Sequence, residues 1–582
     1  MYKFENTILI VVFNYANCIC NKNIIKTIYE KHFKTIIFYS DYPIIQDNEV
    51  NFIEIDKGCY THKVFNHFYK KYKSIIDDSD GLFYTMDDNI INVNILNLFD
   101  SEKIIYYHNE IKTLDNYSGW QWDNQSWGKN AITNLINDNE FKKYNINKFS
   151  GAFADWFYLP KKYLNDTLFD LFELFSNYKV FLELAIPSII NNIEKDRLQY
   201  QSFTDEILWE NNRWNFLNKD YIYNSLNHNH NLCLHPIKFN QNPNSKKWLK
   251  EILCKNKCVI ITTINKPTET ILKHINNTEY DVIIVGDNKT PDDYKNLNCI
   301  YLDIPSQKKL FPELSELLPY NHYCRKNLGY LYAIKKGYKI IYETDDDNIP
   351  YDNFDNILQY NNIQMIITEQ NNVWINIFKY FTNNAYIWPR GFPLSLLKNN
   401  PNYLIQYTDK TPSIINGLVE NDPDVDALFR IICNHQDSIT WDKNKYVLIN
   451  NTNVCIFNTQ NTFWLNPKLF MCLLIPCSVS FRYCDILRGI INNIILKKTN
   501  NYMMYTSPNV IQNRNEHDLM SDFKSEYEMY IHNEKILNFI ENDIGNITSV
   551  KELLFLIYNN LLVNNVIKQK DIDILNKWNT YF

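Results

Sequence analysis

Two acidic segments of this chain have the residue types and the spacing to hold a metal ion. In Phe83–Asn89 an apolar run ends in Asp87-Asp88, and in Ile341–Asn348 a second apolar run ends in three consecutive aspartates. Carboxylates crowded at the end of a buried strand repel one another, and a bound divalent cation relieves that repulsion. The ion that such oxygen ligands favour is Mn²⁺ or Mg²⁺, and its predicted ligands are Asp87, Asp88, Asp345 and Asp347.

The chain before the first acidic segment is expected to alternate between strands and helices. Apolar and β-branched runs predict strands at 7–13, 35–40, 51–55 and 81–86, and helical spacing predicts helices at 21–33 and 62–73. Strands that alternate with helices indicate a parallel sheet. Open sheets of this kind bind ligands at the carboxyl ends of their strands, which is where the last of these strands delivers Asp87.

The same order of elements restarts in the second half of the chain. Strands are expected at 258–264, 281–285, 299–302 and 339–342, with a helix at 322–336 before the last of them. From opening strand to acidic segment the chain runs 80 residues in the first half, Ile8 to Asp88, and 87 in the second, Val259 to Asp346. Two α/β modules in tandem explain this repetition better than chance does.

These patterns predict an α/β fold of two tandem modules followed by a helical extension. The expected boundaries are 1–240 for the first module, 241–508 for the second and 509–582 for the extension, with a polar junction at 236–247. Helical periodicity over 523–539 and 550–567 marks the extension. We expect the extension to pack on the second module or to form a subunit contact, as in a homodimer.

Composition excludes several classes of protein. The 582 residues include only 12 Gly, and neither GxxxxGK[ST] nor GxGxxG occurs, which argues against a P-loop NTPase and a Rossmann dehydrogenase. A net charge of −7 without a basic stripe argues against a nucleic-acid partner. The 13 Cys show no metal-site or disulfide spacing, and no apolar run is long enough to span a membrane. We therefore expect a cytoplasmic enzyme with reduced thiols, in a host cytoplasm or viral factory if the chain is viral.

Two structural alternatives compete with the metal assignment. An EF-hand calcium loop needs Gly at position 6 and Glu at position 12, but counting from Asp345 these positions hold Pro350 and Asn356. A surface turn is the other alternative, because Asp and Asn favour turns. The turn explains a single acidic segment well, but it does not explain a near-copy at the matching place in the second module.

A third acidic run, 420–426, precedes an expected helix at 427–433. Asp424 or Asp426 could act there as the catalytic base that takes a proton from an acceptor hydroxyl, or could bind a sugar hydroxyl. Capping of the helix is the structural alternative, and the sequence leaves the choice open.

Basic and imidazole side chains could complete such a site. Arg390 is the candidate for a phosphate contact, because a guanidinium matches phosphate geometry, and its rivals are Arg325, Arg430, Arg482 and Arg488. One histidine could complete a metal shell, but zinc-finger spacing is absent, and a structural role is favoured for His228, His230 and His235.

The second module resembles a known family in six separated segments. They are similar, in order, to the glycosyltransferase-like domain of the STELLO family, at 260–265, 327–334, 342–346, 417–430, 457–461 and 485–489. The first module is similar, more weakly, to the other half of those proteins at 65–72, 81–89, 157–161 and 184–187.

The resemblance implies a GT-A-like fold, the Rossmann-like fold of nucleotide-diphospho-sugar transferases, in both modules. The donor sugar does not follow from the resemblance. From the resemblance together with the acidic segments, we expect a metal-dependent hexosyl or pentosyl transferase, with a UDP-sugar as the favoured donor and a glycan or protein as the acceptor. The expected substrate-binding residues are then Thr263, Asn265, Arg325, Asp346 and Arg390.

Three features of this chain depart from the family. The two halves occur in swapped order, and the family's membrane anchor has no counterpart. The acidic motif reads Glu343-Thr-Asp345-Asp346-Asp347. If both modules are active, the enzyme is bifunctional.

Three other functions compete with glycosyl transfer. A non-catalytic scaffold would bind nucleotide sugars without turning them over. A sugar nucleotidyltransferase would need the glycine-rich, Arg-containing loop that such enzymes have after their first strand, and that loop is absent. A sugar-binding structural protein is supported only by the aromatic content of 15%.

Overall fold

The computed structural model describes most of the chain. The described residues are 4–13, 16–41, 47–56, 58–107, 128, 130–208, 218–227, 229, 231–237, 239, 243–277, 279–384, 386–398, 401–433, 439–514, 518–541, 545 and 547–582.

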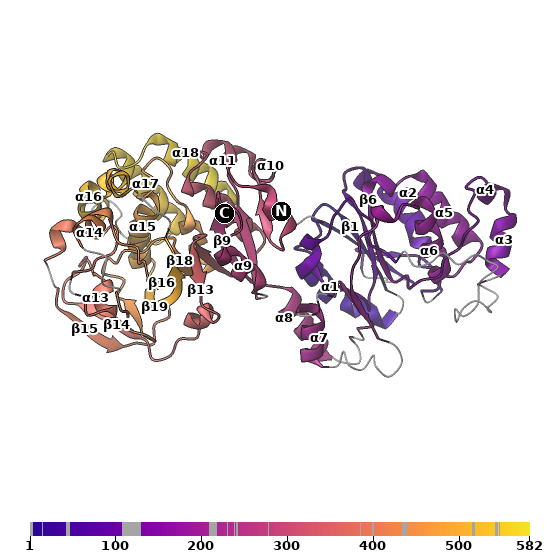
Figure 1. The fold of residues 1–582 in the computed structure, drawn as a ribbon, viewed down its shortest axis with the longest axis horizontal. Coiled ribbons are helices and arrows are strands. Elements are labelled where there is room, and N and C mark those ends of the chain that lie inside the picture. The colour runs from indigo at the N-terminus through magenta and orange to yellow at the C-terminus, as the bar shows by residue number, and fades with distance from the viewer. Residues whose placement is uncertain are drawn as a thin grey trace. The chain divides into compact units, whose positions relative to one another are not determined.

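The chain divides into two compact units, Met1–Cys254 and Lys255–Phe582 (Figure 1). The helix α8 (Pro243–Leu253) belongs to the first unit, because its Leu249 and Leu253 lie in the same core as Leu9. The first unit therefore extends past residue 240, where the polar composition suggests a junction. A polar stretch shows where chain is exposed, but not which core the next helix joins.

The first unit carries the elements expected from its sequence and several more. In chain order they are β1 (Ile8–Phe13), α1 (Lys22–Tyr29), β2 (Thr35–Ser40), β3 (Val50–Phe52), α2 (Lys63–Asp77), β4 (Gly81–Met86), β5 (Ile90–Ile91), α3 (Ala131–Asn137), α4 (Asn139–Lys142), β6 (Trp156–Pro160), α5 (Asp166–Asn177), α6 (Leu182–Ile193), β7 (Asp205–Ile207), α7 (Lys219–Asn227), β8 (Cys233–His235) and α8.

The main sheet of the first unit has the strand order β3-β2-β1-β4-β6. Its first four strands are parallel, and β6 runs antiparallel to β4. Successive side chains of a strand point to opposite faces. In β1, Ile8 and Ile10 therefore join a core with α2, α5 and α6, while Leu9 and Val11 join a core with α1, α7 and α8 (Figure 1). A short second sheet has the order β5-β8-β7.

The second unit is larger. Its elements are β9 (Lys257–Thr262), α9 (Glu269–Asn276), β10 (Tyr280–Val285), β11 (Ile300–Leu302), α10 (Ile304–Leu310), α11 (Pro312–Leu317), α12 (Lys326–Lys335), β12 (Ile340–Thr344), β13 (Asn348–Pro350), β14 (Gln364–Thr368), α13 (Phe378–Phe381), β15 (Tyr403–Tyr407), β16 (Ile414–Glu420), α14 (Ala427–Ile432), β17 (Tyr446–Ile449), β18 (Asn461–Trp464), α15 (Cys484–Lys498), β19 (Met503–Gln512), α16 (Leu519–Glu541), α17 (Val550–Val563) and α18 (Gln569–Trp578).

The sheet of the second unit begins with the same arrangement as the first. Its strand order opens β11-β10-β9-β12-β18, with four parallel strands followed by an antiparallel one. It continues through β16, β19, β17, β14 and β15, and β13 pairs with β19. The predicted α/β class, with two tandem modules, is confirmed. The sheets are mixed and not purely parallel, because the direction of β6 and β18 depends on long-range pairing that local sequence does not encode.

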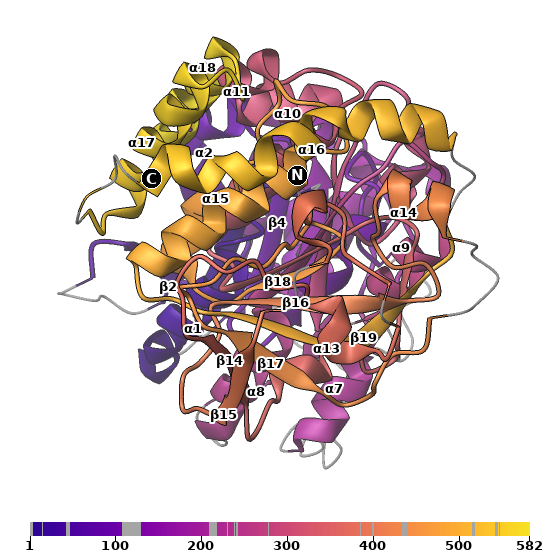
Figure 2. The ribbon, with the colours of Figure 1, turned by 90° about the vertical axis from the view of Figure 1, so that its left-hand side faces the viewer.

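Part of the expected extension belongs to the second sheet. The strand β19 runs to Gln512, so residues 509–512 are paired β-structure and not the start of a helical tail. Beyond it, α16, α17 and α18 are helical as predicted. Figure 2 shows α15 and α16 on one side of the strands β16, β18 and β19. Within the chain, α16, α17 and α18 therefore pack on the second unit.

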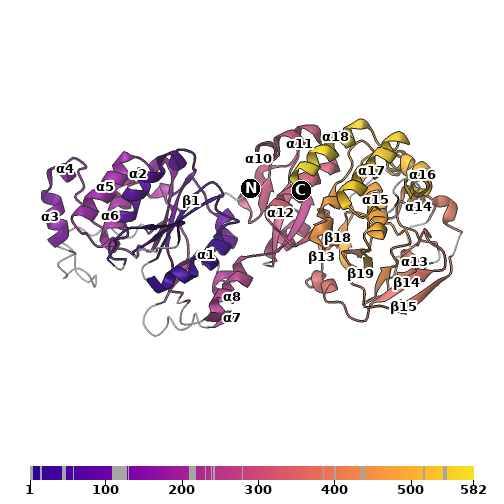
Figure 3. The same cartoon turned by 180° about the vertical axis from the view of Figure 1, so that it is seen from behind.

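A glycine lets α12 approach the strands that frame the acidic segment. A Cβ on Gly329 would lie 2.6 Å from Cγ2 of Val285 and 2.8 Å from Cγ2 of Ile260. Only a residue without a side chain fits this contact between α12 and the strands β9 and β10. Figure 3 shows this side of the second unit, with α12 labelled.

A buried ion pair anchors β12 below its acidic end. Glu343 and Arg488 have side chains 0% and 1% exposed, and two guanidinium nitrogens of Arg488 lie 2.6 and 2.9 Å from the Glu343 carboxylate oxygens. Trp464 Nε1 donates a third hydrogen bond to Glu343 at 2.9 Å, and the Tyr330 hydroxyl donates a fourth. Removing one member of such a pair leaves an uncompensated buried charge.

We predict that Glu343→Gln lowers the free energy of unfolding of the second unit by about 3–5 kcal/mol, because Arg488 loses its buried counter-charge. Urea denaturation followed by circular dichroism measures this loss. Glu279→Gln is the matched control, since the ion pair of Glu279 with Lys257 is exposed and should change stability by less than about 1 kcal/mol. Equal midpoints for Glu343→Gln and wild type would contradict the assignment.

Candidate active site

A cavity of about 400 Å³ opens at the carboxyl ends of β9, β10 and β12 in the second unit. Most of the residues predicted from the sequence line it: Thr263, Asn265, Arg325, Asp345, Asp346, Asp347, Arg390 and Asp424. Parallel strands that end at one edge of a sheet bring together residues far apart in the chain, and this geometry explains the convergence.

Asp345 lies beside two donors, one in the short turn of helix before α12 and one at the first residue of α12. The Tyr323 hydroxyl donates to Asp345 Oδ1 at 2.5 Å, and Lys326 Nζ lies 3.6 Å from the same oxygen. Although the side chain is 30% exposed, desolvation raises the pKa of Asp345 to about 7, and the like charge of Asp347 adds to this effect. A cation beside Asp345 would favour its ionised form.

Asp347 offers an oxygen that no described residue satisfies. Gln512 Nε2 donates to Asp347 Oδ2 at 3.0 Å, while Oδ1 is buried and has no hydrogen-bond partner among the described residues. Burial also raises the pKa of Asp347. A buried carboxylate oxygen without a donor is costly, and a metal ion is one group that would satisfy it.

Asp346, between them, is held by a different set of donors. Thr263 Oγ1 and Asn265 Nδ2 donate to Asp346 Oδ2 at 2.5 and 3.0 Å. The Thr268 hydroxyl donates to the main-chain carbonyl of Asp346 at 2.6 Å, and Thr268 also caps α9. The three aspartates therefore have distinct surroundings, and the chemistry of the donors fits a hard cation at Asp345 and Asp347.

Arg390 is fixed by two carboxylates. Its Nε lies 2.8 Å from Asp424 Oδ1, and its terminal nitrogens lie 3.1 and 2.8 Å from the two oxygens of Asp485. It also donates to the main-chain carbonyl of Arg482. Most donors of Arg390 are thus already used, which leaves little capacity for the phosphate contact predicted from its sequence context.

Asp424 lines the cavity as a stable carboxylate. Burial by itself would raise the pKa of Asp424, but the guanidinium of Arg390 outweighs burial and lowers that pKa to about 2. Asn458 Nδ2 also donates to Asp424 Oδ2 at 2.5 Å. A carboxylate with this pKa is a weak base at neutral pH, but it remains a good acceptor for a hydroxyl group.

Asp426 lies outside the lining of the cavity. Its side chain is buried, and Oδ1 accepts from the Phe429 main-chain N–H at 2.7 Å, which caps α14. Trp388 Nε1 donates to Oδ2 at 2.6 Å. These contacts support the alternative in which Asp426 caps the helix α14.

Arg325 carries a charge that no described carboxylate pairs. Its guanidinium is buried and donates to Gln307, to the main-chain carbonyls of Ser315 and Leu318 and to the Ser315 hydroxyl, and it stacks on the Tyr320 ring at 4.6 Å. No carboxylate lies within ion-pair distance of Arg325 in the described ranges. Burial lowers the pKa of Arg325. Its donors are used as fully as those of Arg390, but its charge lacks a described carboxylate partner, whereas that of Arg390 is paired with Asp424 and Asp485, and this makes Arg325 the better candidate for an anionic group on the cavity wall.

The C-terminal helices contribute to the cavity in a way that the sequence did not indicate. Arg482 and Arg514 line the cavity and pair with acids of α16, Arg482 with Glu526 at 2.6 Å and Arg514 with Asp522 at 3.0 Å. The extension therefore orients part of the cavity wall. No local motif announces such pairs, since they join segments that are far apart in sequence.

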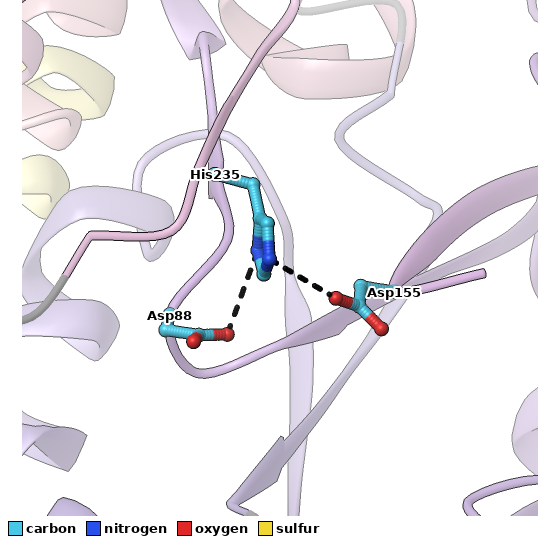
Figure 4. A group of neighbouring side chains, drawn as sticks. All are labelled: Asp88, Asp155 and His235. Atoms are coloured by element: carbon cyan, nitrogen blue, oxygen red, sulfur yellow. Dashed lines mark ion pairs between the residues drawn. The ribbon is translucent and has the colours of Figure 1, made fainter. Parts of the chain in front are cut away.

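The first unit gathers a second set of ligand-type side chains. Asp88, Asp155 and His235 each offer one ligand atom, and these atoms lie within 4.8 Å of one another (Figure 4). His235 Nδ1 lies 3.7 Å from Asp88 Oδ1, and Nε2 lies 3.4 Å from Asp155 Oδ2. Asp87, predicted as a ligand with Asp88, is buried and outside this group.

Sequence patterns anticipate only part of this group. They favour a structural role for His235, and they do not single out Asp155. Asp155 directly precedes β6, a strand that starts with Trp156, and this position at a strand end is the available signal. His228 and His230 lie outside the described residues.

None of the helices in the described part of the chain combines the length and the apolar character that crossing a membrane requires.

Both units thus present polar groups at the carboxyl ends of their parallel strands, and comparison with known sequences gives the family that the second unit resembles. Residues 482–580 match the family model of STELLO glycosyltransferases. The chain is 28% identical over 275 residues to the probable glycosyltransferase STELLO1 of Arabidopsis thaliana, which covers 43% of this chain and 35% of the relative. It is 26% identical over 307 residues to STELLO2 of the same plant, covering 49% and 39%.

The predicted resemblance to the STELLO family is therefore confirmed, and it supports the glycosyltransferase class. The matched regions span well under half the length of these relatives. Two solved structures of the glycosyltransferase GlyE from Streptococcus pneumoniae TIGR4 also align, one of them the apo-form. They are 16% and 15% identical and cover 60% and 53% of this chain, and 93% and 84% of their own, with TM-scores of 0.21 and 0.17. Structural similarity at this level supports no inference about the site or the reaction.

The roles of Asp426 can be separated by two substitutions. Asp426→Asn keeps one oxygen that caps α14 but turns its NH₂ toward Trp388 Nε1, so it should lower stability by about 1–3 kcal/mol and leave turnover nearly unchanged. Asp426→Ala loses both acceptors and should lower stability by at least as much. Thermal unfolding and a donor-hydrolysis assay measure the two effects. A well-folded Asp426→Asn protein without turnover would show that the carboxylate acts as a base.

Proposed function

We propose that this chain is a metal-dependent glycosyltransferase, with its principal reaction in the cavity of the second unit. The observation that carries the proposal is the convergence of Asp345 and Asp347 on a cavity that also presents Arg325. Among the described residues, one Asp347 oxygen lacks a donor and the Arg325 guanidinium lacks a carboxylate partner. Opposite charges placed this way suit a diphosphate bound through a metal ion and an arginine. The similarity to STELLO sequences in this unit supports the same chemistry.

Asp345 and Asp347 would hold Mn²⁺ or Mg²⁺, which when bound neutralises charge on the diphosphate leaving group. Two protein carboxylates are a small ligand set. This suits an ion that takes its other oxygen ligands from water and from the substrate phosphates.

The remaining groups of the cavity would place the donor. Arg325 would contact a phosphate oxygen, because it lines the cavity and no described carboxylate pairs with it. Asp346, with Thr263 and Asn265, would hold the ribose hydroxyls of the nucleotide, since these three side chains already form one hydrogen-bonded group. A UDP-sugar is the donor that we favour.

Asp424 would accept a hydrogen bond from a sugar hydroxyl. Its pKa of about 2 keeps it ionised, and Arg390 with Asp485 fixes its position. In the reaction, the oxygen of an acceptor hydroxyl would bond to the anomeric carbon while the bond to the diphosphate breaks, and the hydroxyl proton would pass to the departing diphosphate. The acceptor, a glycan or a protein, would enter from the open side of the cavity.

The proposal extends to the first unit as a second, separate donor site, which would make the enzyme bifunctional. It is supported by the shared strand order and by the position of Asp88 after β4, which matches that of the acidic segment after β12. A scaffold that binds nucleotide sugars without turnover is the main competing function, and an assay for product separates the two.

We predict that Asp345→Ala lowers donor hydrolysis or transfer by about 10²–10³-fold, because the leaving group loses the charge stabilisation that this carboxylate secures. Turnover of nucleotide sugars with Mn²⁺ by the full chain gives the measurement. Asp352→Ala, an exposed aspartate beyond the acidic segment, is the matched control and should keep wild-type turnover. Full activity in Asp345→Ala would refute the assignment.

A further inference from the structure

The antiparallel strands beside the acidic segments fix a correspondence between the two units. Thr85 on β4 pairs with the first residue of β6, and Thr344 on β12 pairs with the first residue of β18. The residue that precedes each antiparallel strand, Asp155 in the first unit and Gln460 in the second, therefore takes the same place beside its acidic segment. By the same alignment, Asp88 corresponds to Asp347.

A second strand pairing extends the correspondence to the histidine. In the second unit, β13 pairs with β19 so that Asn348 lies opposite Gln512. In the first unit, β5 pairs with β8 so that Ile90 lies opposite Leu234. Continued by one residue, this antiparallel register places Asn89 opposite His235. Asn89 corresponds to Asn348, so His235 occupies the position that Gln512 has in the second unit.

The two units thus build different chemistry in the same place. In the second, Gln460 Nε2 donates to Gln512 Oε1 at 2.7 Å, and Gln512 donates in turn to Asp347 at 3.0 Å. This chain of neutral amides satisfies one carboxylate oxygen without an ion. In the first unit, two carboxylates flank an imidazole at 3.4 and 3.7 Å.

The first arrangement has the composition of a metal-ligand set. The side chains of Asp88, Asp155 and His235 are 18%, 15% and 13% exposed, so they are largely withdrawn from water but remain reachable. Two atoms bound to one ion at about 2.1 Å each lie at most about 4.2 Å apart. Ligand atoms that lie within 4.8 Å of one another therefore need only small side-chain rotations to share an ion.

The correspondence between the units also gives Asp87 and Asp88 different counterparts. Asp87 takes the place of Asp346, and Met86 takes the place of Asp345. The first unit therefore lacks one of the two carboxylates expected to hold the ion in the second, and Asp155 and His235 supply ligand atoms where the second unit has amides.

We propose that the first unit binds a divalent transition-metal ion through Asp88, Asp155 and His235, and that the two units consequently differ in metal preference. Imidazole nitrogen suits transition metals, whereas a hard ion such as Mg²⁺ is bound through oxygen. In the second unit, the three aspartates after β12 offer carboxylate oxygens, and His322, which lines the same cavity, uses Nδ1 to accept from the Cys324 main-chain N–H. This inference concerns metal binding by the first unit, and it holds whether or not either unit transfers sugar.

The test uses the full chain freed of metal by a chelator and then saturated with Mn²⁺, without any nucleotide. Pulsed electron paramagnetic resonance should detect coupling of the Mn²⁺ electrons to an imidazole nitrogen in the wild type. His235→Gln, which installs the residue found at the matching place in the second unit, should abolish that coupling. It should also weaken one Mn²⁺ binding event by at least about tenfold.

His67→Gln is the matched control, because His67 is a half-buried histidine of the same unit that contacts Tyr39 on a different element. It should keep the nitrogen coupling. Asp155→Asn serves as a second variant, and circular dichroism confirms that each variant is folded. Absence of nitrogen coupling in the wild type, or equal Mn²⁺ affinity in folded His235→Gln, would overturn the proposal. Such a result would leave His235 as a base held between two acids.

Discussion

Three consecutive carboxylates at the end of a buried strand repel one another, and side chains of the second unit hold them in place with hydrogen bonds. Each aspartate after β12 has its own donors: Tyr323 for the first, Thr263 and Asn265 for the second, and Gln512 for the third. One buried oxygen of the third is left without a donor among the described residues. The protein thus holds the negative charge in place but does not fully neutralise it, which is the condition for binding a cation.

The rest of the second unit keeps this edge rigid. Glu343 and Arg488 fix β12 two residues before the charged segment begins, and Gly329 lets α12 approach the neighbouring strands. The helix α16 supplies the acids that orient Arg482 and Arg514 on the cavity wall. The family match at 482–580 covers these helices, so the region that matches the STELLO model is one that shapes the cavity and does not merely cover the sheet.

Local pattern predicts the strands and the acidic edge well, because apolar runs such as 35–40 and 81–86 coincide with β2 and β4. It does not predict the direction of β6 and β18, nor the place of His235, since both depend on pairing between distant segments. Asp426 shows a different limit. A carboxylate before a helix can cap it or do chemistry, and the bond to the Phe429 N–H together with burial against Trp388 favours the cap. Comparison of the strand register in the two units shows that His235 in the first unit occupies the position of Gln512 in the second.

We propose that the aspartates at the carboxyl end of β12 bind a cation, and that this cation binds the diphosphate of the donor. Anomalous diffraction at the manganese edge, from crystals of the full chain soaked with Mn²⁺ and UDP, tests this most directly. We expect a manganese peak about 2.0–2.6 Å from carboxylate oxygens of Asp345 and Asp347, with the UDP diphosphate on the same ion. UDP bound elsewhere, or a β12 end without manganese at saturating metal, would contradict it.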